Sequence, residues 1–170
     1  MKTLLLIRHA KSDWSENHNS DFDRTLNARG LNDAPKMAIL IHQRINKIDV
    51  IFSSQAIRAF TTATIFAHIW NIPQNEIITS LDFYENGFKA IPIFLSNVPN
   101  RYENVAVFGH NPDISLLVNH FTGEDVGNLP TCSVSRIDFE IDDWEEISKE
   151  NGKLIFIETP KATFFDRSIL

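Results

Sequence analysis

The 170-residue sequence contains one cysteine, six glycines and two methionines. A disulfide needs two cysteines and zinc knuckles repeat them in pairs, so Cys132 alone excludes both an internal disulfide and a cysteine-based zinc site. No segment approaches the ~18 consecutive apolar residues of a transmembrane helix, and no signal-type apolar stretch precedes the first expected strand. We therefore expect a cytoplasmic protein with no membrane partner.

An excess of positive charge is also absent. Sixteen Lys and Arg residues stand against 22 Asp and Glu residues, which gives a formal net charge of −6. Because nucleic-acid binders usually carry a basic stripe, we expect no nucleic-acid partner, and positive charge that binds phosphate must be confined to a pocket. A chain of this length can bury its own core, so we expect one domain over residues 1–170 and a monomer by default.

Continuous apolar runs at residues 3–7, 50–52 and 105–108 predict strands that are covered on both faces, as in a parallel sheet. Each run is followed by a polar loop or by apolar residues at helical spacing. A long polar loop is expected over residues 10–29, and a second loop over residues 82–88. Strands that alternate with helices favour an α/β fold.

The pattern changes in the last third of the chain. Residues 137–141 alternate between apolar and acidic, and a turn at 151–152 precedes the apolar run 154–157. We predict a three-layer α/β fold with a mostly parallel central sheet, helices on both faces and a C-terminal antiparallel edge hairpin. The helix after residue 108 is expected to be capped by Asn111, with Pro112 at its first position.

Candidate catalytic side chains follow the predicted strands directly. Arg8 and His9 end the first strand, Arg58 lies in the first turns of the helix after the second, and His110 follows the run 105–108. Because the carboxyl ends of parallel strands form the ligand crevice of open α/β sheets, these residues should meet at one edge. A helix N-terminus adds attraction for an anion.

Two arginines and two histidines in one crevice indicate phosphoryl transfer. Guanidinium donors stabilise the charge that spreads over the equatorial oxygens of the transition state. A neutral imidazole can attack phosphorus and form a phosphohistidine. We expect the neighbouring arginines to lower the pKa of His9 and keep its ring neutral near pH 7.

These motifs resemble those of the histidine phosphatase (phosphoglycerate mutase-like) superfamily, and most closely its small SixA-type phosphohistidine phosphatases. The resemblance implies the phosphoglycerate mutase-like fold, His9 as the phosphorylated nucleophile, and phosphoryl binding by the other three catalytic residues. It also implies that Lys11, Ser15 and Arg24 line the pocket mouth, and it makes Glu85 a candidate general acid. The motifs that carry it are Arg8-His9-Ala10-Lys11-Ser12, Asp23-Arg24 with Leu26 and Gly30, Ser53 to Ala59, Gly109-His110-Asn111-Pro112, Leu129-Pro130-Thr131 and Thr159-Pro160-Lys161.

The resemblance predicts a metal-independent phosphatase that needs no cofactor and acts on phosphohistidine in a protein. Lys11 and Ser15 stand where mutase-like members carry an acidic residue and an asparagine, which weakens a mutase assignment. Three alternatives remain: a phosphatase of small phosphate esters, a phosphate-binding module without turnover, and a metallohydrolase. The metallohydrolase would use His9, His110 and either Asp13 or Asp113 as ligands.

Overall fold

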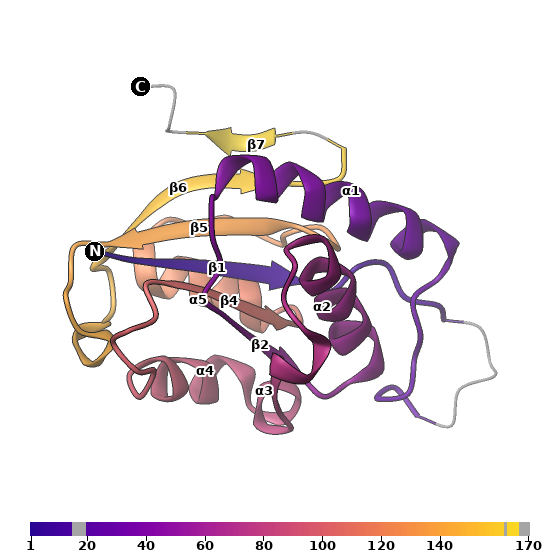
Figure 1. Cartoon of the computed structure of the whole chain (residues 1–170), viewed down its shortest axis with the longest axis horizontal. Coiled ribbons are helices and arrows are strands. Elements are labelled where there is room, and N and C mark those ends of the chain that lie inside the picture. Colours follow the sequence, from indigo (N-terminus) through magenta and orange to yellow (C-terminus); the bar gives the residue numbers. More distant parts are fainter. Residues whose placement is uncertain (15–19, 162, 167–170) are drawn as a thin grey trace.

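A mixed β-sheet runs through the protein between two layers of helices (Figure 1). The computed structural model describes residues 1–14, 20–161 and 163–166. Among these residues the strand order is β3-β2-β4-β1-β5-β6-β7, parallel from β3 to β1 and antiparallel from β1 to β7. The strands are β1 (Lys2–Arg8), β2 (Val50–Ser54), β3 (Ile78–Ser80), β4 (Asn104–Gly109), β5 (Val134–Phe139), β6 (Gly152–Glu158) and β7 (Thr163–Asp166).

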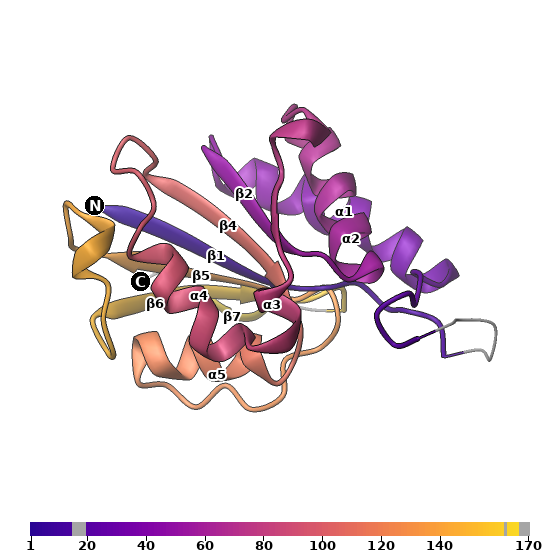
Figure 2. The same ribbon diagram turned by 90° about the horizontal axis from the view of Figure 1, so that it is seen from below.

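Helices α1 and α2 cover one face of the sheet, and α4 and α5 cover the other (Figures 1 and 2). The architecture therefore confirms the predicted α/β fold with helices on both faces and an antiparallel C-terminal hairpin, β5–β6. In the described part of the chain, no helix has the length and apolar character needed to span a membrane. The helices are α1 (Ala28–Arg44), α2 (Ile57–Ile69), α3 (Asp82–Glu85), α4 (Gly87–Leu95) and α5 (Asp113–Thr122), with short 3-10 helices η1 (Gln74–Glu76) and η2 (Trp144–Glu146).

The central strand β1 is buried on both faces. Successive side chains of a strand point to opposite faces. Leu4 and Leu6 accordingly join the apolar cluster under α4 and α5, whereas Leu5 and Ile7 join the cluster under α1 and α2. All four side chains are fully buried. The uninterrupted apolar run therefore reflects two covered faces, and it fixes the strand end that carries Arg8.

Between the carboxyl end of β1 and the start of α1, the described residues 10–14 and 20–27 form no helix or named strand, and we call this segment the 10–27 loop (Figure 1). The loop folds back on itself, because Ser12 pairs with Leu26 in an isolated antiparallel bridge. Gly30 in α1 packs directly against the start of this loop. A Cβ on Gly30 would lie 2.1 Å from the carbonyl oxygen of Lys11, so only glycine fits there. The close packing holds Lys11 and Ser12 in place beside the strand end.

Two local predictions need correction, one for residues 82–88 and one for the edge of the sheet. The loop expected at 82–88 contains α3 and the first turn of α4, separated by Asn86. A helix of four residues is too short to show helical periodicity in the sequence. The edge strand β7 was not expected either; it pairs with β6 through a register shift between Ile157 and Glu158.

The predicted cap of α5 is also wrong. Pro112 occupies the N-cap position, and the helix has no side-chain cap hydrogen bond. The Asn111 amide instead donates to the Ser115 hydroxyl at 2.9 Å and to the Leu129 carbonyl oxygen at 3.1 Å. Ser115 lies on α5 and Leu129 on the segment before β5, so the Asn111 side chain ties that segment to the start of α5.

Candidate active site

The carboxyl ends of β1, β2 and β4 open into a small polar cavity, which we call the strand-end pocket. Its volume is about 290 Å³. The pocket gathers residues from the end of β1, the 10–27 loop, the start of α2 and the segments after β4 and before β5. The residues that line it are Arg8, His9, Lys11, Ser12, Trp14, Asp21, Arg24, Arg58, His110, Asn111 and Thr131.

The register of the parallel pair β1–β4 brings the two candidate histidines together. Arg8 lies opposite Gly109 in this register, and the His9 amide donates to the Gly109 carbonyl oxygen at 3.0 Å. The two strands therefore end side by side, and the residue that follows each of them is a histidine. The ring centroids of His9 and His110 are 5.2 Å apart.

His9 is held in a defined tautomer. Its Nδ1 lies 2.7 Å from the carbonyl oxygen of Ala10, which can only accept a hydrogen bond. Nδ1 must therefore carry the proton, which leaves the lone pair of the neutral ring on Nε2. Arg58 Nε points at this lone pair from 3.3 Å. The result is an oriented nitrogen nucleophile beside a fixed positive charge.

Burial keeps this imidazole neutral. The His9 side chain is almost completely buried, and its pKa is lowered to about 3. Burial is the largest cause, and the nearby His110, Arg58 and Arg8 lower the pKa further. We expected the arginines to cause the shift, but they are secondary to the loss of solvent. At neutral pH the Nε2 lone pair is thus available for attack on phosphorus.

Arg58 reaches from the first turn of α2 back over the strand ends, as its position in the sequence predicts. Arg58 is only 4% exposed. Besides Nε at His9, it donates through Nη1 to the backbone carbonyl of Asp21 and through Nη2 to the Asp21 carboxylate at 2.9 Å. Three nitrogens with fixed partners hold the guanidinium plane in one orientation, so it needs little reorganisation to meet a bound anion.

His110 is oriented by a serine that the sequence analysis did not single out. His110 Nε2 lies 2.8 Å from the hydroxyl of Ser54, at the end of β2. The Ser54 hydroxyl accepts a hydrogen bond from the amide of Ala56 at 3.2 Å and can also donate its own hydrogen to Nε2. In that arrangement Nδ1 of His110 carries the proton and acts as a donor. The pKa of His110 is also lowered to about 3, chiefly by burial and then by Arg58.

Two buried nitrogens of the pocket have no hydrogen-bond partner among the described residues, namely Arg8 Nε, which carries a hydrogen, and His110 Nδ1, which carries one when Ser54 donates to Nε2. The other end of the Arg8 guanidinium is anchored, because Nη1 donates to the Leu129 carbonyl oxygen. Unpaired buried donors are costly and uncommon in native proteins. Arg8 and His110 line the strand-end pocket together with His9, and a tetrahedral oxyanion bound there would satisfy both nitrogens. The donor set therefore fits a phosphoryl group.

Asp21 and Tyr84 form a second group of contacts around Arg58. The Tyr84 hydroxyl donates to the Asp21 carboxylate at 2.9 Å, and its ring packs edge-on against His110 at 5.5 Å. Arg24 donates to the same carboxylate at 2.8 Å. The sequence analysis overlooked Asp21 and Tyr84. The spacing of Asp21 and Arg24, an acid three residues before a base, was the available signal for this ion pair.

The structure places two of the four remaining predicted site residues in the strand-end pocket. Lys11 and Arg24 line the strand-end pocket, and Arg24 stacks on the exposed ring of Trp14 at 3.7 Å. Ser15 lies outside the described residues. Glu85 lies on α3 with an exposed side chain and is not among the residues that line the pocket. Within the described part of the chain, no three His, Cys, Asp or Glu side chains are grouped to hold a metal ion.

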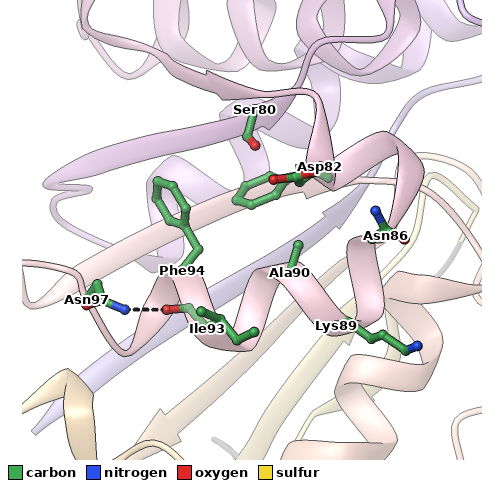
Figure 3. Close-up of a pocket in the computed structure, with 9 residues that line it drawn as sticks. Ser80, Asp82, Asn86, Lys89, Ala90, Ile93, Phe94 and Asn97 are labelled. Atoms are coloured by element: carbon green, nitrogen blue, oxygen red, sulfur yellow. Dashed lines mark hydrogen bonds between the residues drawn. The ribbon is translucent and has the colours of Figure 1, made fainter.

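A larger hollow lies on the other side of α3, and we call it the α3–α4 groove (Figure 3). Its volume is about 540 Å³. Phe94 and Ile93 are among the apolar residues that line it, and the Asn97 amide donates to the carbonyl oxygen of Ile93. The groove is lined by Ser80, Asp82, Phe83, Asn86, Lys89, Ala90, Ile93, Phe94 and Asn97, which do not include any of the predicted site residues.

Comparison with solved structures gives the same architecture. SixA from Agrobacterium tumefaciens, assigned as a phosphohistidine phosphatase, superposes with a TM-score of 0.79 at 25% identity over 94% of this chain and 98% of that chain. The protein histidine phosphatase SixA in complex with tungstate superposes with the same TM-score at 21% identity, over 94% of this chain and 97% of that one.

Comparison of sequences identifies the family. An uncharacterized chloroplastic protein from Arabidopsis thaliana is 26% identical over 182 residues, which cover 96% of this chain and 80% of the relative. The model of the histidine phosphatase superfamily (branch 1) matches residues 4–90, which include the ends of β1 and β2 and the whole of α2. By this match the chain belongs to branch 1 of the histidine phosphatase superfamily.

Proposed function

We propose that the protein is a metal-independent phosphatase that forms a phosphohistidine at His9 and hydrolyses phosphohistidine in a protein. One observation carries the proposal: a neutral imidazole with its lone pair on Nε2 lies in the same pocket as two buried nitrogens, Arg8 Nε and His110 Nδ1, that have no partner among the described residues. A nucleophile, a fixed guanidinium and unsatisfied donors are the parts that phosphoryl transfer requires.

The reaction follows from the roles of these groups. His9 Nε2 forms a bond to phosphorus while the bond to the leaving group breaks on the opposite side. Arg8 Nε, Arg58 and His110 Nδ1 donate to the equatorial oxygens, where negative charge spreads in the transition state. Water then attacks the phosphohistidine, inorganic phosphate leaves, and the electron pair returns to His9. The hydrogen bond from His9 Nδ1 to Ala10 keeps the ring in position through both steps.

The carboxylates around the pocket favour phosphohistidine over an alkyl phosphate. An alkoxide is a poor leaving group and needs a general acid. Glu85 is exposed and outside the lining, and Asp21 is the sole acidic side chain among the described residues that form the pocket. Although burial alone would raise the pKa of Asp21, the Tyr84 hydrogen bond and the Arg58 charge lower it, so Asp21 is ionised at neutral pH. An imidazole leaving group needs no such acid. When the phosphorylated ring is already protonated on its second nitrogen, the imidazole leaves as a neutral base.

Phosphate release from defined substrates tests the proposal. In the presence of a strong chelator, the wild-type protein should dephosphorylate a histidine-phosphorylated protein much faster than a phosphoserine peptide. His9→Ala should lose this activity, whereas His68→Ala, an exposed histidine on α2, should keep it. Faster turnover of the phosphoserine peptide would refute the substrate assignment. Loss of activity with the chelator would refute the metal-independent mechanism.

A further inference from the structure

Asp21 places an anion in a pocket that otherwise collects positive charge. Arg8, Lys11, Arg24 and Arg58 line the same cavity. A carboxylate there weakens the attraction for a phosphoryl group, because like charges repel. Its position is nonetheless well determined by three hydrogen bonds from neighbouring side chains. Phosphoryl binding alone therefore does not account for this residue.

The contacts of Asp21 leave it able to accept one more hydrogen bond. A carboxylate has about four acceptor sites, two on each oxygen. On Oδ2, both are used by the Arg58 guanidinium and the Tyr84 hydroxyl at 2.9 Å each. On Oδ1, Arg24 uses one site at 2.8 Å. Among the contacts of the described residues, Oδ1 thus keeps one acceptor site, and the side chain is 48% exposed.

The leaving group of the reaction comes to the same side of the pocket. In-line displacement requires the leaving group to lie opposite His9 Nε2 across phosphorus. His9 lines the pocket and is 5% exposed, whereas the Asp21 side chain is 48% exposed, so we infer that the side opposite His9 is the open one. The Arg58 guanidinium lies between Asp21 and His9, because it donates hydrogen bonds to both side chains. Asp21 is also far more exposed than His9, which places it toward the mouth.

We propose that Asp21 Oδ1 accepts the ring N–H of the leaving imidazole and so makes Asp21 the residue that selects phosphohistidine as substrate. This inference rests on the proposed function and adds to it the group that recognises the leaving side. A cationic phosphoimidazole ring carries a proton on its second nitrogen, and a carboxylate binds such an N–H more strongly than a neutral acceptor does.

The step balances without a general acid. His9 Nε2 supplies the electron pair for the new bond to phosphorus, and the bond from phosphorus to the substrate nitrogen breaks. Its electron pair returns to that nitrogen, while the second ring nitrogen keeps its proton against Asp21. The product is a neutral imidazole, so no proton has to move during the transfer. The same carboxylate disfavours leaving groups that are anionic, such as a phenolate or a sugar acid.

Two substrates with one phosphoryl group and different leaving groups test this role. Phosphoimidazole presents the ring N–H, whereas 4-nitrophenyl phosphate releases an anion that needs neither proton nor N–H partner. We would measure kcat/KM for both with wild type, Asp21→Asn and Asp21→Ala. Asp23→Asn is the matched control, because it removes the same charge two residues away, where Asp23 accepts a hydrogen bond from Ser20 outside the pocket lining.

The ratio of the two kcat/KM values isolates the leaving-group contact, since any effect on phosphoryl binding is common to both substrates. A hydrogen bond to a charged group contributes enough for about a tenfold to hundredfold change. We expect both Asp21 variants to lower the ratio of phosphoimidazole to 4-nitrophenyl phosphate by that amount, and Asp23→Asn to leave it unchanged. Circular dichroism and thermal unfolding would establish that the variants are folded.

Two other results separate this inference from the proposed function. If the Asp21 variants change both substrates by the same factor, Asp21 does not contact the leaving group, although the protein still hydrolyses phosphohistidine. If the wild-type protein hydrolyses 4-nitrophenyl phosphate but neither phosphoimidazole nor a phosphohistidine protein, the proposed function itself fails, and the role of Asp21 fails with it.

Discussion

The two hollows on either side of α3 differ in a way that their size does not reveal. The α3–α4 groove has nearly twice the volume of the strand-end pocket, about 540 Å³ against about 290 Å³. Its lining includes exposed apolar side chains such as Ile93, which is 68% exposed. The smaller pocket contains two histidines and three arginines with defined partners. The reaction proposed for the strand-end pocket depends on the convergence of fixed polar groups and not on the space available.

The side chains of the short helix α3 contact residues of both hollows. On α3, Phe83 is buried and lines the groove, and it packs edge-on against Phe94 at 5.2 Å. The next residue, Tyr84, points the other way and contacts Asp21 and His110. Substitutions on the two sides of α3 should therefore have different consequences, which the following predictions use.

Among substitutions that leave the proposed nucleophile in place, the largest effect is expected from Arg58→Ala. Loss of one preorganised donor to a transition-state oxyanion lowers kcat by about 10²–10³-fold. Steady-state kinetics with 4-nitrophenyl phosphate measures this effect. Arg101→Ala is the control, because Arg101 is exposed and stacks on Tyr102 outside the pocket. An Arg58→Ala enzyme with wild-type kcat would show that the guanidinium does not act in the transition state.

The two hollows should also differ in how they affect stability. The strand-end pocket contains two buried histidines, so it should make the free energy of unfolding depend on pH, whereas no histidine among the described residues lines the α3–α4 groove. The pKa of His9 and of His110 is about 3 in the folded protein and about 6.5 in the unfolded chain. Their neutral burial thus stabilises the fold fully above pH 6.5, and this contribution is lost as the pH falls toward 3. Between pH 7 and pH 5 the loss is about 2 kcal/mol for each histidine.

Urea unfolding at the two pH values measures this dependence. His9→Gln and His110→Gln should each remove about 2 kcal/mol of the difference between pH 7 and pH 5, because glutamine does not titrate. His68→Gln, at an exposed position, should leave the difference as it is in the wild type. The same pH dependence in all three variants would mean that the pocket histidines are not buried in neutral form.

Ser54→Ala should have a smaller effect on catalysis. It removes the hydroxyl that orients His110, and one hydrogen bond of about 1.4 kcal/mol corresponds to a tenfold change in kcat. KM should change little, because the arginines that bind the phosphoryl group remain. Ser53→Ala is the matched control, since the Ser53 hydroxyl donates to the Ser54 carbonyl oxygen and touches no histidine. Equal effects of the two variants would indicate a structural role only.

The smallest effect is expected in the groove. Lys89→Ala and Ile93→Ser should change kcat/KM for 4-nitrophenyl phosphate by less than about twofold, because surface substitutions away from functional contacts are usually near neutral. The same kinetic assay measures both variants. A loss of tenfold or more would show that the larger hollow contributes to the reaction, and the contrast between the two hollows would no longer hold.

The sequence predicted the parts of the site that follow directly from the strands. Apolar runs locate β1, β2 and β4, and parallel strands present the residues after them at one edge. The sequence therefore predicts that His9, Arg58 and His110 converge at this edge, and all three line the strand-end pocket. The cause of the low pKa of His9 was predicted less well, because burial depends on all the elements that cover the ring.

The parts that were missed depend on contacts between distant segments. Asp21 comes from a long loop with no periodicity, and its partners Arg58 and Tyr84 lie 37 and 63 residues away. Asn111 is a good capping residue by type, but the acceptors near Leu129 hold its amide. Local propensity is a weak guide wherever such tertiary hydrogen bonds compete with it.

Trapping of the covalent intermediate tests the central claim most directly. The enzyme would be mixed with 4-nitrophenyl phosphate labelled in the phosphoryl group, quenched under alkaline denaturing conditions, and analysed by mass spectrometry of its peptides. We predict an acid-labile phosphoryl group on His9 in the wild type and no label in His9→Ala. A label on a different residue, or turnover by His9→Ala at the wild-type rate, would contradict the account.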